Sequence, residues 1–135
     1  TKILSGTVKK TASNQYYIVL IVESDKQPIS KTNHSVGLDL GVSDLMITSD
    51  GIKIPTIRFD KELSEKKHYW EKRLARRRDQ KDRKQASYKK RFGIDLDDSE
   101  FKNYINAKVM VAKYSQKIAN QRLDYLHKVT TSLVR

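Results

Sequence analysis

One heptapeptide decides the fold: Val36-Gly37-Leu38-Asp39-Leu40-Gly41-Val42. Because alternate side chains of a strand point to opposite faces, a strand here puts its four aliphatic residues on one face. Gly37, Asp39 and Gly41 share the other face. A lone carboxylate between two glycines leaves room for a close approach to the backbone, as a metal-bound phosphate requires. The alternative is an ordinary strand with a solvated aspartate and two bulge glycines.

Two more strands are predicted downstream, over residues 44–49 and 52–59. Asp50-Gly51 between them is the strongest short hairpin signal in the chain. With the strand at 36–42 they form a three-stranded antiparallel meander. Because turn aspartates usually bond their own backbone, Asp50 is assigned to its turn, and Asp44 to the turn after Gly41.

Upstream, β-rich runs over residues 3–10 and 15–23 flank the turn-forming pair Ser13-Asn14 and predict a hairpin. A polar linker over 26–35, broken by Pro28, follows it. We therefore predict a hairpin module over 1–25 and a second module over 36–135.

From Lys61 the apolar period becomes helical. Residues 61–92 contain neither Gly nor Pro, and Gly93 is the expected C-cap residue. Asp97, Asp98 or Ser99 is expected to cap a second helix, which makes an antiparallel helical hairpin over 61–135. The predicted core stripe of the second helix is Ile105, Val109, Ala112, Ala119, Leu123, Leu126 and Leu133.

The composition excludes several classes of protein to which the chain could otherwise belong. The absence of cysteine among the 135 residues excludes a disulfide framework and thiolate metal sites. No apolar run is long enough to span a bilayer and no signal peptide is recognisable, so no membrane partner and a cytoplasmic location are expected. A start at Thr1 and a stop inside an amphipathic pattern suggest a piece of a longer protein.

Positive charge is concentrated in the first helix. Of the net charge of +12, residues 61–92 carry +9. Such a block favours polyanions through counterion release, whereas the alternative is a solvated, self-repelling helix. Tyr69, Trp70, Tyr88 and Phe92 are interleaved and could stack on bases, although Trp70 at helical spacing is better explained as core. The predicted nucleic-acid-binding residues are Arg73, Arg76, Arg77, Arg78, Arg83, Lys84, Lys89 and Lys90.

Three separated motifs occur in the order seen in one known family. The heptapeptide with Leu45-Met46-Ile47-Thr48-Ser49-Asp50-Gly51 resembles the first motif of a RuvC-like nuclease core. The basic run Glu71-Lys72-Arg73-Leu74-Ala75-Arg76-Arg77-Arg78 and the later stretch from Lys117 to Lys128 resemble the TnpB/OrfB family. These are transposon-encoded proteins related to the type V CRISPR effector nucleases.

The resemblance implies an α+β (α/β-like) fold: a truncated RNase H-like core with the three-stranded meander, the basic helical hairpin and an N-terminal β-hairpin from a preceding barrel. It implies RNA-guided DNA cleavage by the full protein, with DNA and guide RNA as partners. Asp39 would be the first catalytic acid and metal ligand. Hard oxygen ligands suit Mg²⁺ or Mn²⁺ in two-metal phosphodiester cleavage. The family takes its other acids from later motifs, beyond Arg135, so the isolated chain is predicted to be inactive.

Two other interpretations stay open. One is a non-enzymatic RNA- or DNA-binding module with a basic helical hairpin. The other is a fragment of an actin-like or sugar-kinase-like ATPase, whose first strand has a similar Gly-x-Asp-x-Gly pattern, although Val42-Ser43-Asp44 lacks its Thr-rich turn. The three histidines, His34, His68 and His127, have no ligand spacing. Unprotected strand edges further predict self-association.

Overall fold

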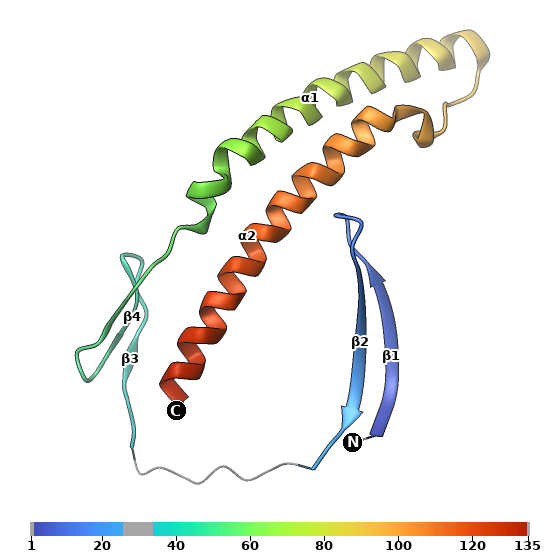
Figure 1. The fold of residues 1–135 in the computed structure, drawn as a ribbon. Helices are drawn as coiled ribbons and strands as arrows, with labels where there is room; N and C mark the ends of the chain where they lie inside the picture. Colours follow the sequence, from blue (N-terminus) through green and yellow to red (C-terminus); the bar gives the residue numbers. More distant parts are fainter. Residues whose placement is uncertain (1, 26–33, 135) are drawn as a thin grey trace. The chain divides into compact units, whose positions relative to one another are not determined.

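The computed structural model describes residues 2–25 and 34–134. The strands are β1 (Lys2–Lys10), β2 (Tyr16–Glu23), β3 (Leu38–Asp39), β4 (Asp44–Thr48) and β5 (Lys53–Pro55). A long helix α1 (Phe59–Phe92), a 3-10 turn η1 (Asp98–Phe101) and a second long helix α2 (Lys102–Val134) follow. The β1–β2 hairpin, the β3–β4–β5 sheet and the two helices (Figure 1) confirm the α+β class. An RNase H-like core stays a prediction.

The chain divides into two compact units, which are described separately. One unit contains the chain up to Val8 and Ile18–Arg58, and the other contains Lys9–Tyr17 and the chain from Phe59 onward. The predicted domain boundaries stay predictions, since residues 26–33 of the expected linker lie outside the described residues.

The turn of the first hairpin forms where the sequence predicts it. Asn14 has a φ of 61°, a left-handed conformation that asparagine tolerates better than most residues. The Thr11 amide donates to the Gln15 carbonyl at 2.9 Å and closes the turn. Ser13 is buried, and its hydroxyl donates to the side-chain oxygen of Gln116 on α2, within the same unit.

The predicted meander is confirmed, with shorter strands. Leu38 lies opposite Thr48 and Asp39 opposite Ile47, and β4 pairs antiparallel with β5. Gly51 adopts a φ of 82° at the Asp50-Gly51 turn, a conformation that glycine reaches without a steric penalty. The third strand ends at Pro55 rather than at residue 59, because α1 begins at Phe59.

The heptapeptide forms a much shorter strand than the one predicted over 36–42. The aliphatic side chains are exposed, from 39% at Val36 to 94% at Val42. The strand itself is reduced to two residues, because the chain turns sharply after Leu40: a Cβ on Gly41 would lie 3.0 Å from the Asp44 carbonyl oxygen. The buried residues of this sheet are instead Met46 and Thr48 on β4.

Both ends of the connection between α1 and α2 have the caps that the sequence predicts. Gly93 has a φ of 74° and its amide donates to the Lys89 carbonyl at 2.8 Å, as expected of a C-terminal cap. Asp97 is the N-cap of η1, where its carboxylate accepts from the Ser99 amide at 2.8 Å. The helices run side by side and antiparallel over most of their length (Figure 1).

The predicted core stripe of α2 is wrong in register. Its buried residues are Ala107, Ile118 and Val129, whereas Leu123 and Leu126 are 54% and 43% exposed. Residues with alternating three- and four-residue spacing form the buried seam, as in a coiled coil: Tyr104, Ala107, Val111, Tyr114, Ile118, Gln121 and Tyr125. Tyrosine and glutamine occupy four of these seven seam positions, so the apolar pattern of the sequence does not by itself identify this face. Neither helix of the described residues is apolar enough over a sufficient length to cross a bilayer.

Candidate metal-ligand and nucleic-acid sites

Asp39 occupies the position expected of an accessible carboxylate. It is the last residue of β3, lies opposite Ile47 and is exposed. None of the described residues forms a hydrogen bond or ion pair with its side chain, so both carboxylate oxygens are free to accept a ligand. Hydrogen bonds of the backbone of Gly37, the residue before Leu38, anchor β3 to the neighbouring chain segment. The Ser49 amide donates to the Gly37 carbonyl at 2.8 Å. The Gly37 amide in turn donates to the Ser49 hydroxyl at 3.1 Å.

The residues present do not form a metal centre by themselves. Across residues 2–25 and 34–134, no group of three aspartates, glutamates or histidines could hold an ion. Asp50 accepts a long hydrogen bond from the Ser49 hydroxyl at 3.4 Å, consistent with a turn role. Asp44 begins β4 and is half-buried. One carboxylate is too few for a two-metal site, so Asp39 could supply only one ligand of it.

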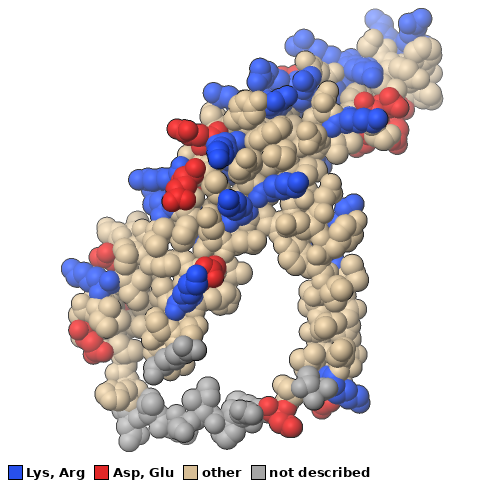
Figure 2. All heavy atoms as spheres, viewed as in Figure 1, with Lys and Arg blue, Asp and Glu red and all other residues tan. Residues whose placement is uncertain are grey.

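All eight predicted nucleic-acid-binding cations lie on α1, and Figure 2 shows Lys and Arg side chains gathered along the helical pair. They differ in how they are held. Lys89 donates to Asp95 at 3.1 Å, and Lys84 lies over the Phe101 ring at 5.4 Å. Within the described part of the chain, no ion-pair or hydrogen-bond partner is found for Arg76, Arg78, Arg83 and Lys90. These four guanidinium and ammonium groups are therefore available to an external anion.

Arg73 is held by two aromatic rings. Its guanidinium carbon lies 5.6 Å from the Tyr69 ring centre and 5.2 Å from the Trp70 ring centre. One guanidinium nitrogen, Nη1, also donates to the Tyr69 hydroxyl at 2.7 Å. Cation–π contacts of this kind fix the direction of the cation. Trp70 is half-buried, and Tyr69 packs edge-on against it at 5.5 Å between ring centres.

Sequence reasoning missed Lys81. Its ammonium donates to Asp98, an ion pair between α1 and η1, and lies 4.9 Å from the Tyr104 ring centre. The hydrogen bond to Asp98 raises the pKa of Lys81 above its usual 10.5, with the Asp98 charge as a further cause, so the side chain stays cationic. A signal was present, because Lys81 follows Leu74 and Arg77 at seam spacing.

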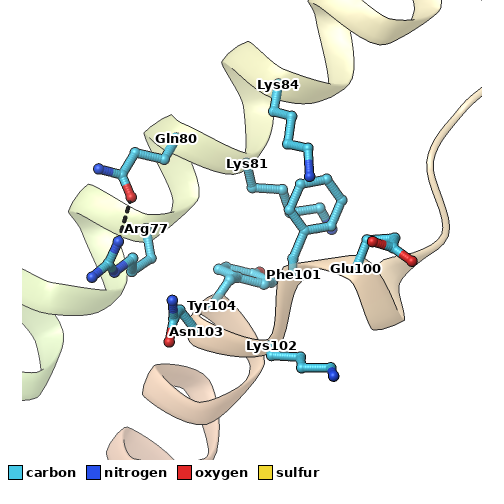
Figure 3. A pocket seen from close by; sticks show the side chains of 9 residues that line it. All are labelled: Arg77, Gln80, Lys81, Lys84, Glu100, Phe101, Lys102, Asn103 and Tyr104. Carbon is cyan, nitrogen blue, oxygen red and sulfur yellow. Dashed lines mark hydrogen bonds between the residues drawn. The ribbon is translucent and has the colours of Figure 1, made fainter.

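Two of the concavities along the helical hairpin are lined by α1. The larger of these two, about 370 Å³, lies between α1 and the start of α2 and is lined by cations, by Glu100 and by Phe101 and Tyr104 (Figure 3). The smaller, about 240 Å³, is lined only by residues of α1: Tyr69, Arg73, Arg76, Arg77 and Gln80. Both are lined by several cations, as a site for a polyanion requires.

Comparison with known proteins places the chain in a class. The profile of the OrfB_IS605 family, described as "Probable transposase", matches residues 17–135. The chain belongs to this transposase family, which confirms the resemblance found in its motifs.

The names of two curated relatives are more specific than the family description. The chain is 32% identical over 136 residues to "Putative RNA-guided DNA endonuclease InsQ" of Escherichia coli strain K12, covering 96% of this chain and 29% of the relative. It is 29% identical over 129 residues to a "Putative RNA-guided DNA endonuclease" of Streptomyces pristinaespiralis, covering 96% of this chain and 27% of the relative. The chain thus spans less than a third of the length of these curated relatives.

Proposed function

We propose that this chain is part of an RNA-guided DNA endonuclease of a mobile element, to which it supplies one catalytic carboxylate and a cationic helix. The family match and the names of the two relatives support this activity. The single observation that carries it is Asp39, which is exposed on β3 in the motif that resembles a nuclease core and has no side-chain partner among the described residues. An RNase H-like arrangement around β3, β4 and β5 is part of the proposal.

The proposed roles follow from chemistry. Asp39 provides a hard oxygen ligand suited to Mg²⁺ or Mn²⁺, and such ions activate water and stabilise the leaving oxygen in phosphodiester cleavage. The remaining ligands of a two-metal site come from outside the described residues. The α1 cations neutralise backbone phosphates and hold the nucleic acid.

The test is cleavage by the full gene product with its RNA. Asp39→Ala is expected to abolish Mg²⁺-dependent cleavage of target DNA and to leave nucleic-acid binding within about twofold, because an exposed side chain without partners contributes little to the fold. Asp50→Ala is the matched control, an acidic residue at a turn of the same sheet, and it should retain cleavage. Undiminished cleavage by Asp39→Ala would contradict a catalytic role for Asp39.

A non-enzymatic nucleic-acid-binding module is the second candidate. It is favoured by the absence of a three-carboxylate group in the described residues and by the charge of α1. Both candidates predict that the isolated chain binds nucleic acid with a steep salt dependence. They differ in the full protein, where this candidate predicts that neither the wild type nor Asp39→Ala cleaves DNA at any Mg²⁺ or Mn²⁺ concentration.

A further inference from the structure

The two concavities of the helical hairpin share a wall. Arg77 and Gln80 line both of them. The smaller one extends from these residues toward Tyr69, and the larger one extends toward η1 and the first residues of α2. The two neighbouring concavities are called here the hairpin groove.

Cations of α1 line the groove over its length. They are Arg73, the adjacent pair Arg76 and Arg77, Lys81 and Lys84, so that successive turns of the helix each contribute at least one cation. At about 1.5 Å per residue, the span from Arg73 to Lys84 covers about 16 Å of helix. Cations repeated at each helical turn match the repeating phosphates of a nucleic-acid strand better than they match a single small anion. Glu100 also lines the groove, and Asp98 pairs with Lys81; both of these acids belong to η1.

Several of these cations are already oriented. Arg73 is fixed by Tyr69 and Trp70, and Arg77 Nη1 donates to the side-chain oxygen of Gln80 at 2.7 Å (Figure 3). Side chains that are ordered before binding lose less conformational entropy when the ligand arrives. By contrast, Arg78, Arg83 and Lys90 lie on the same helix, line neither concavity and have no partner among the described residues.

Neutral amides stand among the cations. Because the oxygen of Gln80 accepts from Arg77, its amide nitrogen is left to donate to a ligand. Asn103, exposed at the start of α2, lines the larger concavity close to Tyr104 (Figure 3). Amide groups donate and accept, and so does the 2′-hydroxyl of RNA, which DNA lacks.

We infer that the hairpin groove binds the backbone of an RNA strand. Its cations contact phosphates, and Gln80 and Asn103 contact 2′-hydroxyl groups. This inference rests on the proposed function and deepens it, because it assigns RNA rather than DNA to one defined face of the helical pair.

The test compares two triple variants of the full chain that each remove three positive charges from α1. Arg76→Gln/Arg77→Gln/Lys84→Gln alters the groove, and Arg78→Gln/Arg83→Gln/Lys90→Gln is the matched control outside it. Dissociation constants for single-stranded RNA and for DNA of the same sequence are measured by fluorescence anisotropy at several salt concentrations. The groove variant is expected to lose about tenfold more RNA affinity than the control variant. Gln80→Ala/Asn103→Ala should lower RNA affinity about threefold and leave DNA affinity unchanged, as expected for lost neutral hydrogen bonds.

The outcomes distinguish a failure of the groove or of its assignment to RNA from a failure of the proposed function. Equal losses in both triple variants would overturn the groove and leave nucleic-acid binding by α1 intact. Equal affinity of the wild-type chain for RNA and DNA would overturn the assignment to RNA. No binding, or binding that ignores salt, would also contradict the proposed function.

A measurement on the wild-type chain removes any dependence on variant folding. Bound RNA is expected to protect Lys84 from acetylation and to leave Lys90 reactive, as read by mass spectrometry. Equal protection of the two lysines would contradict the groove even if the triple variants unfold.

Discussion

The two ends of the helical hairpin are held together by different chemistry. At the open end, where α1 begins and α2 ends, α1 contributes Leu63, Trp70 and Leu74 to the seam. Phe59 also packs edge-on against Tyr125 there, at 5.7 Å between ring centres. At the loop end, the seam positions of α1 are Arg77, Lys81, Gln85 and Tyr88. There the helices are joined by the Lys81–Asp98 ion pair and by cations over aromatic rings.

This difference separates stability from binding. Apolar burial stabilises the helix pair at both ends, through Leu63 and Ile118 at the open end and Phe101 and Ala107 at the loop end, since exposed ion pairs contribute little. At the loop end these apolar residues come from η1 and α2, so α1 carries cations in seam positions there without losing the pairing. A single hairpin can therefore present a charged groove along one helix because the other helix supplies the apolar side chains.

The largest expected effect comes from a substitution that weakens side-chain packing at the open end. Ile118→Ala should lower the free energy of unfolding by about 2–4 kcal/mol, because a buried aliphatic side chain is removed and a cavity is left. Ile118 is 7% exposed. Leu123→Ala, on the same helix but 54% exposed, should cost about 0.5 kcal/mol. Urea unfolding followed by circular dichroism measures both. Similar costs would show that the α2 seam runs through the predicted stripe after all.

Sequence reasoning succeeded where a local signal decides the structure. The turns at Asn14 and Gly51 and the cap at Gly93 follow from backbone preferences that need no tertiary context. It failed at the α2 seam, where burial depends on which face meets α1. It also overestimated the strand at Asp39, because the close approach of Gly41 to Asp44 ends the pairing. The candidate acid was found through its motif, but Lys81 was missed because its partner Asp98 lies across the loop.

A smaller effect is expected where the hairpin turns. Gly93→Ala should destabilise the chain by about 1 kcal/mol, since a φ of 74° is unfavourable for a residue with a Cβ. Gly93→Asn should recover about half of the loss, because asparagine tolerates this conformation. Thermal unfolding of both variants measures the difference. Equal losses would contradict the expectation that asparagine tolerates this conformation better than alanine, and a larger loss for Gly93→Asn would point to side-chain volume.

Removing polar seam residues would make the two ends more alike. The side-chain oxygens of Gln121 and Gln85 are buried and have no hydrogen-bond partner among the described residues. Gln121→Leu at the open end should stabilise the chain by about 1 kcal/mol, since an unsatisfied group is replaced by an apolar one. Gln85→Leu should gain less, because its amide nitrogen donates to the Leu96 carbonyl at 3.3 Å and that bond is lost. Urea unfolding ranks the two, and the opposite ranking would contradict this account of the seam.

The smallest expected effect is a loosening of the loop end in acid. The hydrogen bond from Lys89 holds the pKa of Asp95 below its usual 3.8, with the Lys89 charge and a bond from Gln85 as further causes, and hydrogen bonds from Ser99 lower the pKa of Asp97. A carboxyl group whose pKa is lower in the folded state binds fewer protons there. Its stabilisation is therefore present above the unfolded pKa and is lost as pH falls through the folded value.

Amide exchange of residues 93–98, followed by NMR, should therefore accelerate below about pH 4 relative to the open end, after correction for intrinsic rates. In Asp95→Asn this pH dependence should weaken, because only one of the two carboxyl groups with a lowered pKa, Asp97, remains. Lys89→Gln, which removes the partner instead, should have a similar effect. The double variant should add little to either one, since both substitutions break the same contact. Additive effects would mean that Asp95 and Lys89 act separately, and the loop end would then owe less to ion pairing than its contacts indicate.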